Sequence, residues 1–305
     1  MAHADDAHPP RPERLTPGTA GPLDPGLYVV STPIGSARDI TLRALDVLTA
    51  ADTLLAEDTR VLRRLLEIHG VALNGREILA YHDHNGRRMR PRLLGLLADG
   101  QSLAYASDAG TPMVADPGHV LAREAIEAGH RVHAVPGASA PLAALTVSGL
   151  PTDRFHFAGF PPQAAGPRRR WLEELAQIPA TLVLFEAPKR MTRILKECVA
   201  VMGGDRRAVM CRELTKKFEE IQRMPLAQLA DASEAMVQKG ECVLLIDRPD
   251  ASSAVEEADI LQALETALAE MSLRDAVQSV VDATGAPKRD VYQLGLGLKA
   301  AKGRP

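Results

Sequence analysis

Short apolar runs alternate with amphipathic patterns of helical period along most of the chain, and this alternation most limits how it can fold. Runs of this length and spacing predict βαβ units, in which helices cover a parallel sheet. In the first part we expect strands at 27–31, 53–57, 78–81, 102–107 and 131–135. We expect helices there at 42–51, 60–69, 90–98, 119–128 and 138–147. The first part of the sequence therefore predicts an α/β domain.

A GLPTD segment at 149–153 interrupts this pattern, and a second unit follows it. In that unit we expect strands at 155–160, 180–186, 207–212 and 241–247, with helices at 169–177, 190–201 and 226–238. After a linker at 249–255, further helices are expected at 258–270, 273–284 and 288–298. This tail is either a helix-turn-helix-like appendage or a plain helical cap on the second domain. The predicted organisation is a disordered extension at 1–25, an α/β domain with a parallel sheet at 26–150, a second α/β domain with a mixed sheet at 151–248, and a helical tail at 256–300.

Composition narrows the class of protein. The formal net charge of −3 gives no overall basic field, so any nucleic-acid contact must come from a local patch. The 3 cysteines stand far apart with no C-x-x-C, which excludes a zinc knuckle and a disulfide framework and fits a reducing cytosol. No apolar run approaches the ~20 residues of a membrane span, and the N-terminal residues lack the apolar core of a secretory signal. We therefore expect a cytoplasmic protein with no membrane partner.

Turns that contain proline and glycine follow three of the expected strands. They are Thr32-Pro33-Ile34-Gly35, SDAGTPMVADPG at 107–118, and Pro136-Gly137-Ala138-Ser139. In an open α/β sheet, ligands bind at the edge formed by the carboxyl ends of the strands. The middle turn lacks a cationic side chain for a phosphate, and the chain has neither G-x-x-x-x-G-K-[ST] nor G-x-G-x-x-G after its first strand. The sequence thus predicts a small-molecule pocket and argues against ATP hydrolysis and ordinary nicotinamide chemistry.

Charged residues stand at other expected strand ends. The segment Glu57-Asp58-Thr59-Arg60 joins an expected strand to an expected helix. Taken alone, Asp58 or Thr59 is an ordinary N-cap residue for that helix. The segment YHDHN at 81–85 is either a contact for a polar substrate or a surface loop, and no third ligand accompanies its histidines, so we expect no metal.

Basic clusters gather in the second unit. Arg168, Arg169 and Arg170 form one, FEAPKR at 185–190 a second, and CRELTKK at 211–217 a third. A run of charged residues usually marks a face of the protein that is exposed to solvent. Three clusters in one domain of an acidic chain indicate a local positive surface, which suits RNA phosphates.

Eight ordered segments together carry a resemblance: TPIGSARDITLRAL, AEDTR, YHDHN, SDAGTPMVADPG, PGASA, SGLPTDRF, FEAPKR and RELTKKFE. They resemble the tetrapyrrole-methylase-like superfamily of S-adenosylmethionine-dependent methyltransferases, and within it the branch that methylates a ribose 2′-oxygen of a cytidine (cytidine 1402) in small-subunit 16S ribosomal RNA. The likeness runs from about 27 to 247, and the tail is similar to the helix-turn-helix segment of that branch. Tetrapyrrole enzymes have Gly-x-Gly-Pro-Gly-Asp after strand one, whereas no acid follows Gly35 here, which agrees with the ribosomal branch.

The resemblance implies a two-domain α/β fold of the class III methyltransferases with a C-terminal helical appendage. It also implies S-adenosyl-L-methionine in the cleft between the domains, a homodimer, and ribosomal RNA or the assembled 30S particle as partner. By position it implies a cofactor pocket made of Pro33, Gly35, Asp108, Gly110, Thr111, Pro112, Val114, Gly137, Ser139, Ala140 and Leu214.

Methyl transfer to a ribose hydroxyl also needs a group that accepts or polarises the departing proton. Glu57 and Glu213 are our candidates for acid–base or orienting roles. The candidates for RNA contact are Arg60, His82, Lys189, Arg190, Arg212 and Lys216. Two alternatives stay open: a methylase of a tetrapyrrole or other small molecule, and a non-catalytic RNA- or ribosome-binding protein.

Overall fold

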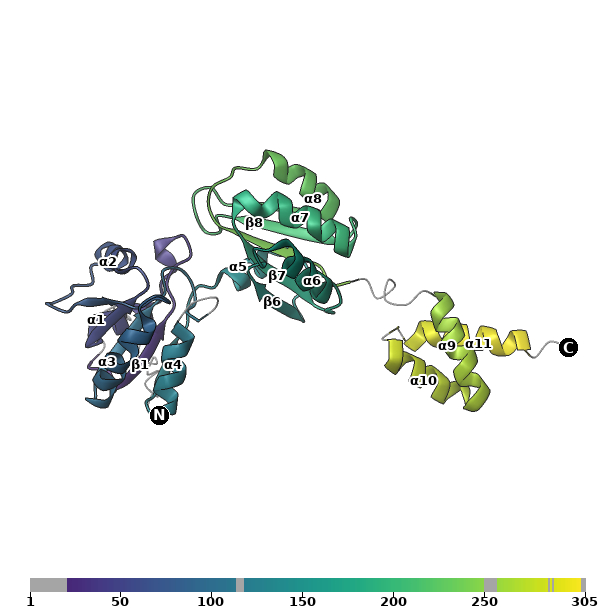
Figure 1. Cartoon of the computed structure of the whole chain (residues 1–305), viewed down its shortest axis with the longest axis horizontal. Coiled ribbons are helices and arrows are strands. Elements are labelled where there is room, and N and C mark those ends of the chain that lie inside the picture. The colour runs from purple at the N-terminus through teal and green to yellow at the C-terminus, as the bar shows by residue number, and fades with distance from the viewer. Residues whose placement is uncertain (1–20, 114–117, 250–256, 285, 287, 303–305) are drawn as a thin grey trace, which may run out of the picture. The chain divides into compact units, whose positions relative to one another are not determined.

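The computed structural model describes residues 21–113, 118–249, 257–284, 286 and 288–302 (Figure 1). The chain divides into two compact units. Unit 1 lies within Met1–Val147 together with Cys211–Glu220, and unit 2 lies within Ser148–Met210 together with Ile221–Pro305. Residues 211–220, which the sequence pattern places in the second domain, group with unit 1 instead.

The first sheet contains β1 (Gly26–Val30), β2 (Thr53–Ala56), β3 (Ile78–Ala80), β4 (Ser102–Ala106) and β5 (Val132–Val135). Its strands lie in the order β3-β2-β4-β1-β5, and each neighbouring pair is parallel. The parallel α/β sheet expected from the alternation is therefore confirmed. Because every strand runs the same way, the segments that follow all five strands leave the sheet at one edge.

The side chains of the first sheet pack on both of its faces. The helices are α1 (Leu42–Ala50), α2 (Thr59–Ile68), α3 (Gly86–Ala98), α4 (Gly118–Glu127) and α5 (Ala140–Ser148), with a short 3₁₀ helix η1 (Ala37–Asp39). Successive residues of a strand point to opposite faces. Ala104 accordingly packs with α1 and α2, whereas Leu103 and Tyr105 pack with α3 and α4. Both faces are covered, as is usual for a parallel sheet.

The second sheet contains β6 (Phe155–Gly159), β7 (Thr181–Glu186), β8 (Arg207–Arg212), β9 (Glu220–Pro225) and β10 (Cys242–Ile246), in the order β6-β7-β10-β8-β9. β6 and β7 are parallel, whereas β7 and β10 are antiparallel, so the sheet is mixed as predicted. Strand β9 was not predicted. It is an edge strand with no fully buried residue, so its sequence lacks the apolar alternation that reveals the other strands.

Helices α6 (Ala165–Ala176), α7 (Pro188–Met202) and α8 (Leu226–Ala232) pack on the second sheet around one apolar core, and the short 3₁₀ helix η2 (Ser233–Ala235) follows α8. The expected helix at 226–238 is thus too long, because α8 ends at Ala232. The expected helix at 190–201 starts too late. Pro188 is its first residue, a position that suits proline because the missing N–H would have no partner there.

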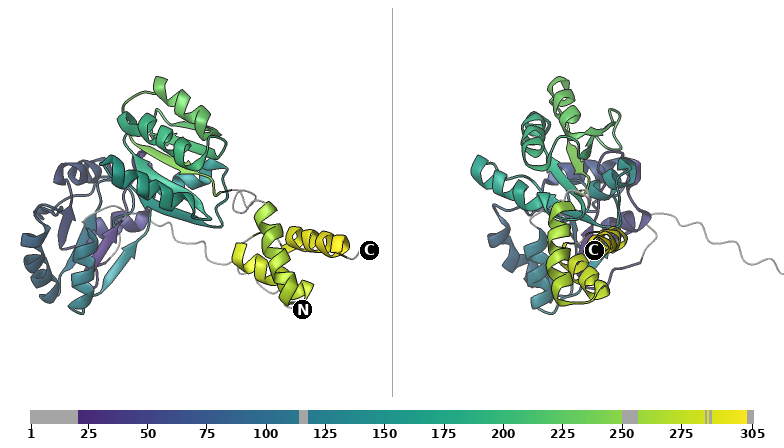
Figure 2. Two further views of the ribbon diagram at one scale, coloured as in Figure 1. Left: turned by 45° about the vertical axis from the view of Figure 1, so that its right-hand side comes forward. Right: turned by 90° about the vertical axis from the view of Figure 1, so that its right-hand side faces the viewer.

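Helices α9 (Glu257–Glu270), α10 (Leu273–Thr284) and α11 (Lys288–Lys302) pack against one another (Figure 2). They form an apolar cluster of their own, in which Leu264, Val277 and Val291 are almost fully buried. Every described member of this cluster comes from these helices or is Ala286 just before α11, so the tail has an apolar core of its own. Across the described residues, we find no helix whose length and apolar character would let it span a bilayer.

Candidate functional site

The turns after β1 and β4 are joined by hydrogen bonds. The backbone N–H of Thr32 donates to the carbonyl of Gly110 (2.9 Å), and the N–H of Gly110 donates to the carbonyl of Thr32 (3.0 Å). The Thr32 hydroxyl also donates to the carbonyl of Ser107 at 3.0 Å. Gly110 has a φ of +81°, a conformation that glycine adopts without strain. These bonds fix the two turns to each other.

The turn after β5 lies against the same two turns. The Thr111 hydroxyl donates to the carbonyl of Ala138 at 2.9 Å. A Cβ added to Gly137 would lie only 2.9 Å from the Cβ of Ser31, so the backbone of this turn packs directly on the end of β1. The three turns therefore meet at one edge of the first sheet, as the sequence predicts.

A fourth segment, 213–216, closes on the first turn from a distant part of the chain. The backbone N–H of Ser36 donates to the hydroxyl of Thr215 at 3.0 Å. A Cβ added to Gly35 would lie 2.5 Å from Thr215 Oγ1, 2.6 Å from Lys216 Cγ and 2.7 Å from the carbonyl oxygen of Leu214. No larger residue fits at position 35 unless this segment moves.

Backbone strain marks this fourth segment. Glu213 has φ +53° and Thr215 has φ +63°. A β-branched residue in the left-handed region is unusual and persists only where the surroundings hold it there. The N–H of Thr215 donates to Glu219 Oε2 at 2.7 Å, which helps to hold this conformation. Sequence reasoning missed Thr215, because nothing in an amino-acid pattern reports a positive φ at a threonine.

Asp108 is half-buried, and its carboxylate accepts a hydrogen bond from the backbone N–H of Asp58 at 2.9 Å. Asp58 is the N-cap of α2 and accepts from the backbone N–H of Arg60. The Arg60 guanidinium also donates to the Asp58 carboxylate, and these bonds lower the pKa of Asp58 to about 2. The N-cap interpretation of Asp58 is thus confirmed.

The described members of the predicted cofactor set all belong to unit 1. Val114 lies outside the described residues. Gly35 and Gly137 are exposed, Gly110 and Pro112 are buried, and Ser139 and Ala140 are half-buried. The set thus presents both backbone and small side chains at one edge, and its part in cofactor binding stays a prediction.

The two catalytic candidates differ in their surroundings. Glu57 is exposed directly after β2. The Glu213 side chain is 17% exposed and pairs with Lys216, whose Nζ lies 2.8 Å from its Oε1. Glu213 therefore offers a carboxylate held beside a cation, and Glu57 offers one on an exposed residue directly after β2.

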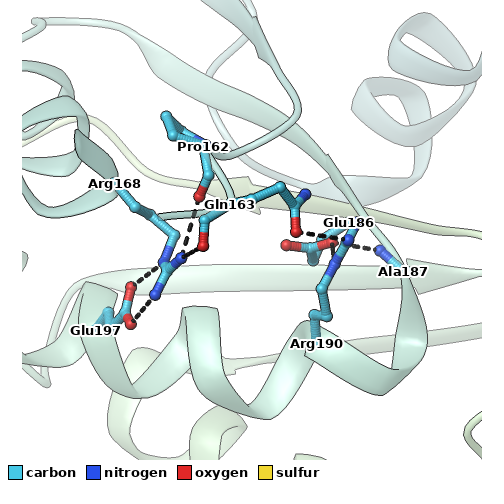
Figure 3. A network of polar contacts seen from close by, with 7 residues as sticks. All are labelled: Pro162, Gln163, Arg168, Glu186, Ala187, Arg190 and Glu197. Carbon is cyan, nitrogen blue, oxygen red and sulfur yellow. Dashed lines mark hydrogen bonds and ion pairs between the residues drawn. The ribbon is translucent and has the colours of Figure 1, made fainter. Parts of the chain in front are cut away.

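The predicted positive surface of the second unit needs correction, because some of its cations are internal ion-pair partners. Arg168 is 2% exposed and not a surface residue. Its guanidinium binds both carboxylate oxygens of Glu197, at 2.6 and 2.7 Å, and donates to the carbonyls of Pro162 and Gln163 (Figure 3). The Arg triplet therefore supplies a tie between α6 and α7 rather than a triple positive patch.

Other predicted RNA contacts are also engaged. Arg190 donates to the buried carboxylate of Glu186 at 2.6 Å and to Gln163 at 3.0 Å (Figure 3). Arg212 is 9% exposed and donates to Glu220 at 3.0 Å. Lys216 pairs with Glu213.

Lys189 is different, because it is exposed and no ion pair joins it to the described residues. Arg60 is exposed but its charge is offset by Asp58. His82 is half-buried, and its Nδ1 has no hydrogen-bond partner within the described chain.

The two histidines of the YHDHN segment lie close to each other. The rings of His82 and His84 are 5.9 Å apart between centroids. In the part of the chain that the structure describes, no group of three or more His, Cys, Asp or Glu side chains is placed to hold a metal ion.

Known proteins resemble the chain across both units and the tail. The family model described as "Tetrapyrrole (Corrin/Porphyrin) Methylases" matches residues 26–230, and the model described as "RsmI C-terminal HTH domain" matches residues 254–299. The ribosomal RNA small subunit methyltransferase I of Mesorhizobium japonicum is 48% identical over 285 residues, covering 93% of this chain and 96% of that protein. The protein of the same name from Pseudomonas aeruginosa is 43% identical, covering 88% of this chain and 96% of that protein.

A solved structure shares the fold. The uroporphyrin-III C-methyl transferase of Thermus thermophilus complexed with S-adenyl homocysteine has a TM-score of 0.51 and 23% identity, covering 72% of this chain and 96% of that one. The predicted class III fold with a C-terminal helical appendage is confirmed. A family model that matches from β1 into α8, together with relatives that cover about nine-tenths of the sequence, establishes that the chain belongs to the tetrapyrrole (corrin/porphyrin) methylase family.

Proposed function

We propose that this chain is an S-adenosylmethionine-dependent methyltransferase that methylates the ribose 2′-oxygen of a cytidine, cytidine 1402, in small-subunit 16S ribosomal RNA. The observation that carries the proposal is its 48% identity, over 93% of the chain, to a protein named ribosomal RNA small subunit methyltransferase I. The tail supports it, because the model that matches residues 254–299 is named for that same group of proteins.

The residues at the carboxyl edge of the first sheet fit this cofactor chemically. S-adenosylmethionine carries no phosphate, and none of the predicted cofactor residues is a lysine or arginine. Gly35 and Gly137 leave backbone groups exposed at the edge, and Asp108, which follows β4 at the same edge, contributes a half-buried carboxylate. Backbone amides and carbonyls suit the hydrogen-bonding edges of a nucleoside. A related structure was solved with S-adenyl homocysteine, which agrees with this assignment.

S-adenosylmethionine, when bound, supplies a methyl group on a sulfonium, which is already a good leaving group. The main task of the protein is then alignment, and orientation of two reactants can supply about 7–11 kcal/mol of a barrier. The turns at 32–36, 107–113 and 136–139 serve this task, because hydrogen bonds between them fix their backbones before any ligand binds. A rigid cradle of this kind holds the methyl donor in one pose.

The 2′-hydroxyl must lose its proton as the new bond forms. We propose Glu57 and Glu213 for accepting or orienting this proton. The Glu213–Lys216 pair, at 2.8 Å, places a proton acceptor and a cation side by side, which suits an oxygen that gains negative character. Replacing Glu213 with Gln tests the role: turnover with saturating cofactor should fall at least tenfold, and unchanged turnover removes Glu213 from the mechanism.

RNA contact divides between direct and indirect roles. We propose that Lys189, which is exposed, and Arg60 and His82 beside the first sheet meet the RNA. Arg190, Arg212 and Lys216 form ion pairs with Glu186, Glu220 and Glu213, and they contribute indirectly by holding these carboxylates in place.

We also propose a cytoplasmic location, since ribosome assembly takes place in the cytoplasm, and a homodimer, as the resemblance implies. Sedimentation tests the dimer: a mass of one 32.7 kDa chain overturns it.

Two measurements test the function. Calorimetric titration with S-adenosylmethionine should give a dissociation constant in the micromolar range. Methyl transfer to assembled small subunits and to naked 16S RNA should yield 2′-O-methylcytidine, whereas a uroporphyrinogen should receive no methyl group. Transfer to the tetrapyrrole instead would assign a small-molecule methylase. Absence of cofactor binding at millimolar concentration would assign a silent RNA binder.

A further inference from the structure

Arginines crowd two segments that leave the first sheet at its carboxyl edge. Residues 57–64 and 82–92 contain 7 arginines and only 3 acids, on a chain whose formal net charge is −3. The first segment follows β2 and opens α2, and the second follows β3 and opens α3. Because all five strands are parallel, both segments leave the sheet at the edge where the turns after β1, β4 and β5 meet.

Among the described residues, many arginines pair with a carboxylate or a carbonyl, but some of those at this edge do not. Asp58 offsets Arg60, and Glu124 binds Arg90 at 2.8 Å. Arg63, Arg87 and Arg88 are exposed, and no ion pair or hydrogen bond joins their side chains to any described residue. We call these three residues the cationic rim.

The arginines predicted to contact RNA in unit 2 differ from the cationic rim, because they already have carboxylate partners. There Arg168 and Arg190 each bind a carboxylate, so moving them to an RNA phosphate would break an existing pair. Binding of a phosphate to the cationic rim breaks no ion pair, because these three guanidinium groups are exposed to solvent. Arginine binds phosphate oxygens through two parallel N–H groups and is the usual side chain for this contact.

We propose that the cationic rim, Arg63, Arg87 and Arg88, is a docking surface for the phosphodiester backbone of the RNA substrate. This inference rests on the proposed function and places the RNA beside the edge where the cofactor residues lie. The contacts neutralise phosphates and carry no sequence information, so they supply affinity and orientation rather than choice of nucleotide.

The experiment compares the full chain with the variant Arg87→Ala/Arg88→Ala. Binding of a fluorescent 16S RNA fragment is measured by anisotropy at several salt concentrations, so that the readout does not depend on methylation. Each lost phosphate contact lowers the slope of log K against log salt by about 0.7–0.9, so the double variant should lose about 1.5 of slope. Its RNA affinity at low salt should fall about tenfold, with the dissociation constant for S-adenosylmethionine unchanged.

Control variants test whether the position of the removed charges matters for RNA binding. Arg123→Ala/Arg131→Ala removes two exposed positive charges from unit 1. Arg123, in the middle of α4, lies 3.6 Å from Glu127, and Arg131 stands just before β5 at the opposite edge. This variant should leave the slope within about 0.3 of wild type. Arg87→Lys/Arg88→Lys should restore most of the affinity, because lysine keeps the charge.

The outcomes separate the two proposals. An unchanged slope in Arg87→Ala/Arg88→Ala, or an equal loss in the Arg123/Arg131 control, overturns the cationic rim while the RNA substrate stands. Wild-type protein that binds no RNA at all overturns the proposed function itself. Loss of S-adenosylmethionine binding in the Arg87/Arg88 variant would mean that these side chains support the fold, and it would also overturn the docking role.

Discussion

At the scale of single residues, Gly35 shows how closely the segments of the site are packed. Gly35→Ala would place a methyl group 2.7 Å from the backbone oxygen of Leu214, which no side-chain rotation can relieve. We expect the affinity for S-adenosylmethionine to fall at least tenfold, as titration calorimetry would measure. Gly95→Ala is the control, since nothing lies within 4 Å of its added Cβ in α3. It should keep cofactor affinity and gain up to about 1 kcal/mol in stability from better helix propensity.

Thr215 fixes the far end of the same turn through its hydroxyl. Thr215→Val keeps the branched shape and the left-handed backbone but removes the acceptor for the Ser36 N–H. An exposed hydrogen bond contributes about 0.5–1 kcal/mol, so cofactor affinity should fall about threefold. Thr215→Ser should restore it. Equal affinities in the valine and serine variants would show that the hydroxyl does not position this turn.

Asp58 should stay ionised throughout the range in which the protein works. Its hydrogen bonds from Arg60 lower its pKa to about 2. A lowered pKa means that any stabilisation from this group is complete above its ordinary pKa and is lost only as the pH falls through about 2. The carboxylate signal of Asp58 in an NMR titration should therefore not move between pH 5 and 9. In Arg60→Ala its midpoint should rise toward the ordinary value for aspartate.

At the scale of elements, apolar periodicity predicts most strands and helices in their order along the chain, because each buried strand needs a continuous apolar run. Periodicity does not reveal β9, an edge strand in which no residue is fully buried. It also does not separate a buried cation from an exposed one: Arg168, Arg169 and Arg170 look alike in sequence. In the structure, Arg168 is buried against Glu197 whereas Arg169 pairs with Glu173 in solvent.

This difference between neighbours gives a prediction about stability. Arg168→Ala leaves Glu197 and two carbonyls without their donor, and loss of one partner of a buried pair costs about 3 kcal/mol. Arg169→Ala removes an exposed i,i+4 pair, which is worth about 0.5 kcal/mol or less. Urea unfolding of the two variants should show this contrast, and equal losses would contradict the assignment of Arg168 to the tie between α6 and α7.

At the scale of the whole molecule, the sequence predicts where ligands gather but not which charges are free. The turns at 32–35, 107–118 and 136–139 were predicted to converge because their strands are parallel, and the described parts do meet. The partners of Arg190 and Arg212 were not predictable, since ion pairing depends on distances that folding alone sets. For the same reason, the sequence does not distinguish Arg87 and Arg88 from the other arginines of the GRRMRPR run at 86–92.

The division into units predicts what the C-terminal helices contribute. The described cofactor candidates belong to unit 1, and α9–α11 bury their apolar residues among themselves. A chain that ends at residue 249 should therefore bind S-adenosylmethionine within twofold of the full chain. Its affinity for 16S RNA should fall, because a helix-turn-helix appendage is missing. Calorimetry and anisotropy measure both, and loss of cofactor binding on truncation would contradict this division.

The hydrogen bond between Ser36 and Thr215 joins residues 179 positions apart. During translation, the turn after β1 leaves the ribosome long before its partner has been made. The parallel sheet can form from the first 147 residues, but the turn after β1 lacks its hydrogen bond to Thr215 until more than two-thirds of the polypeptide has been made. If the turn after β1 binds the methyl donor as proposed, a nascent chain that ends before Thr215 should bind this donor more weakly than the finished chain does.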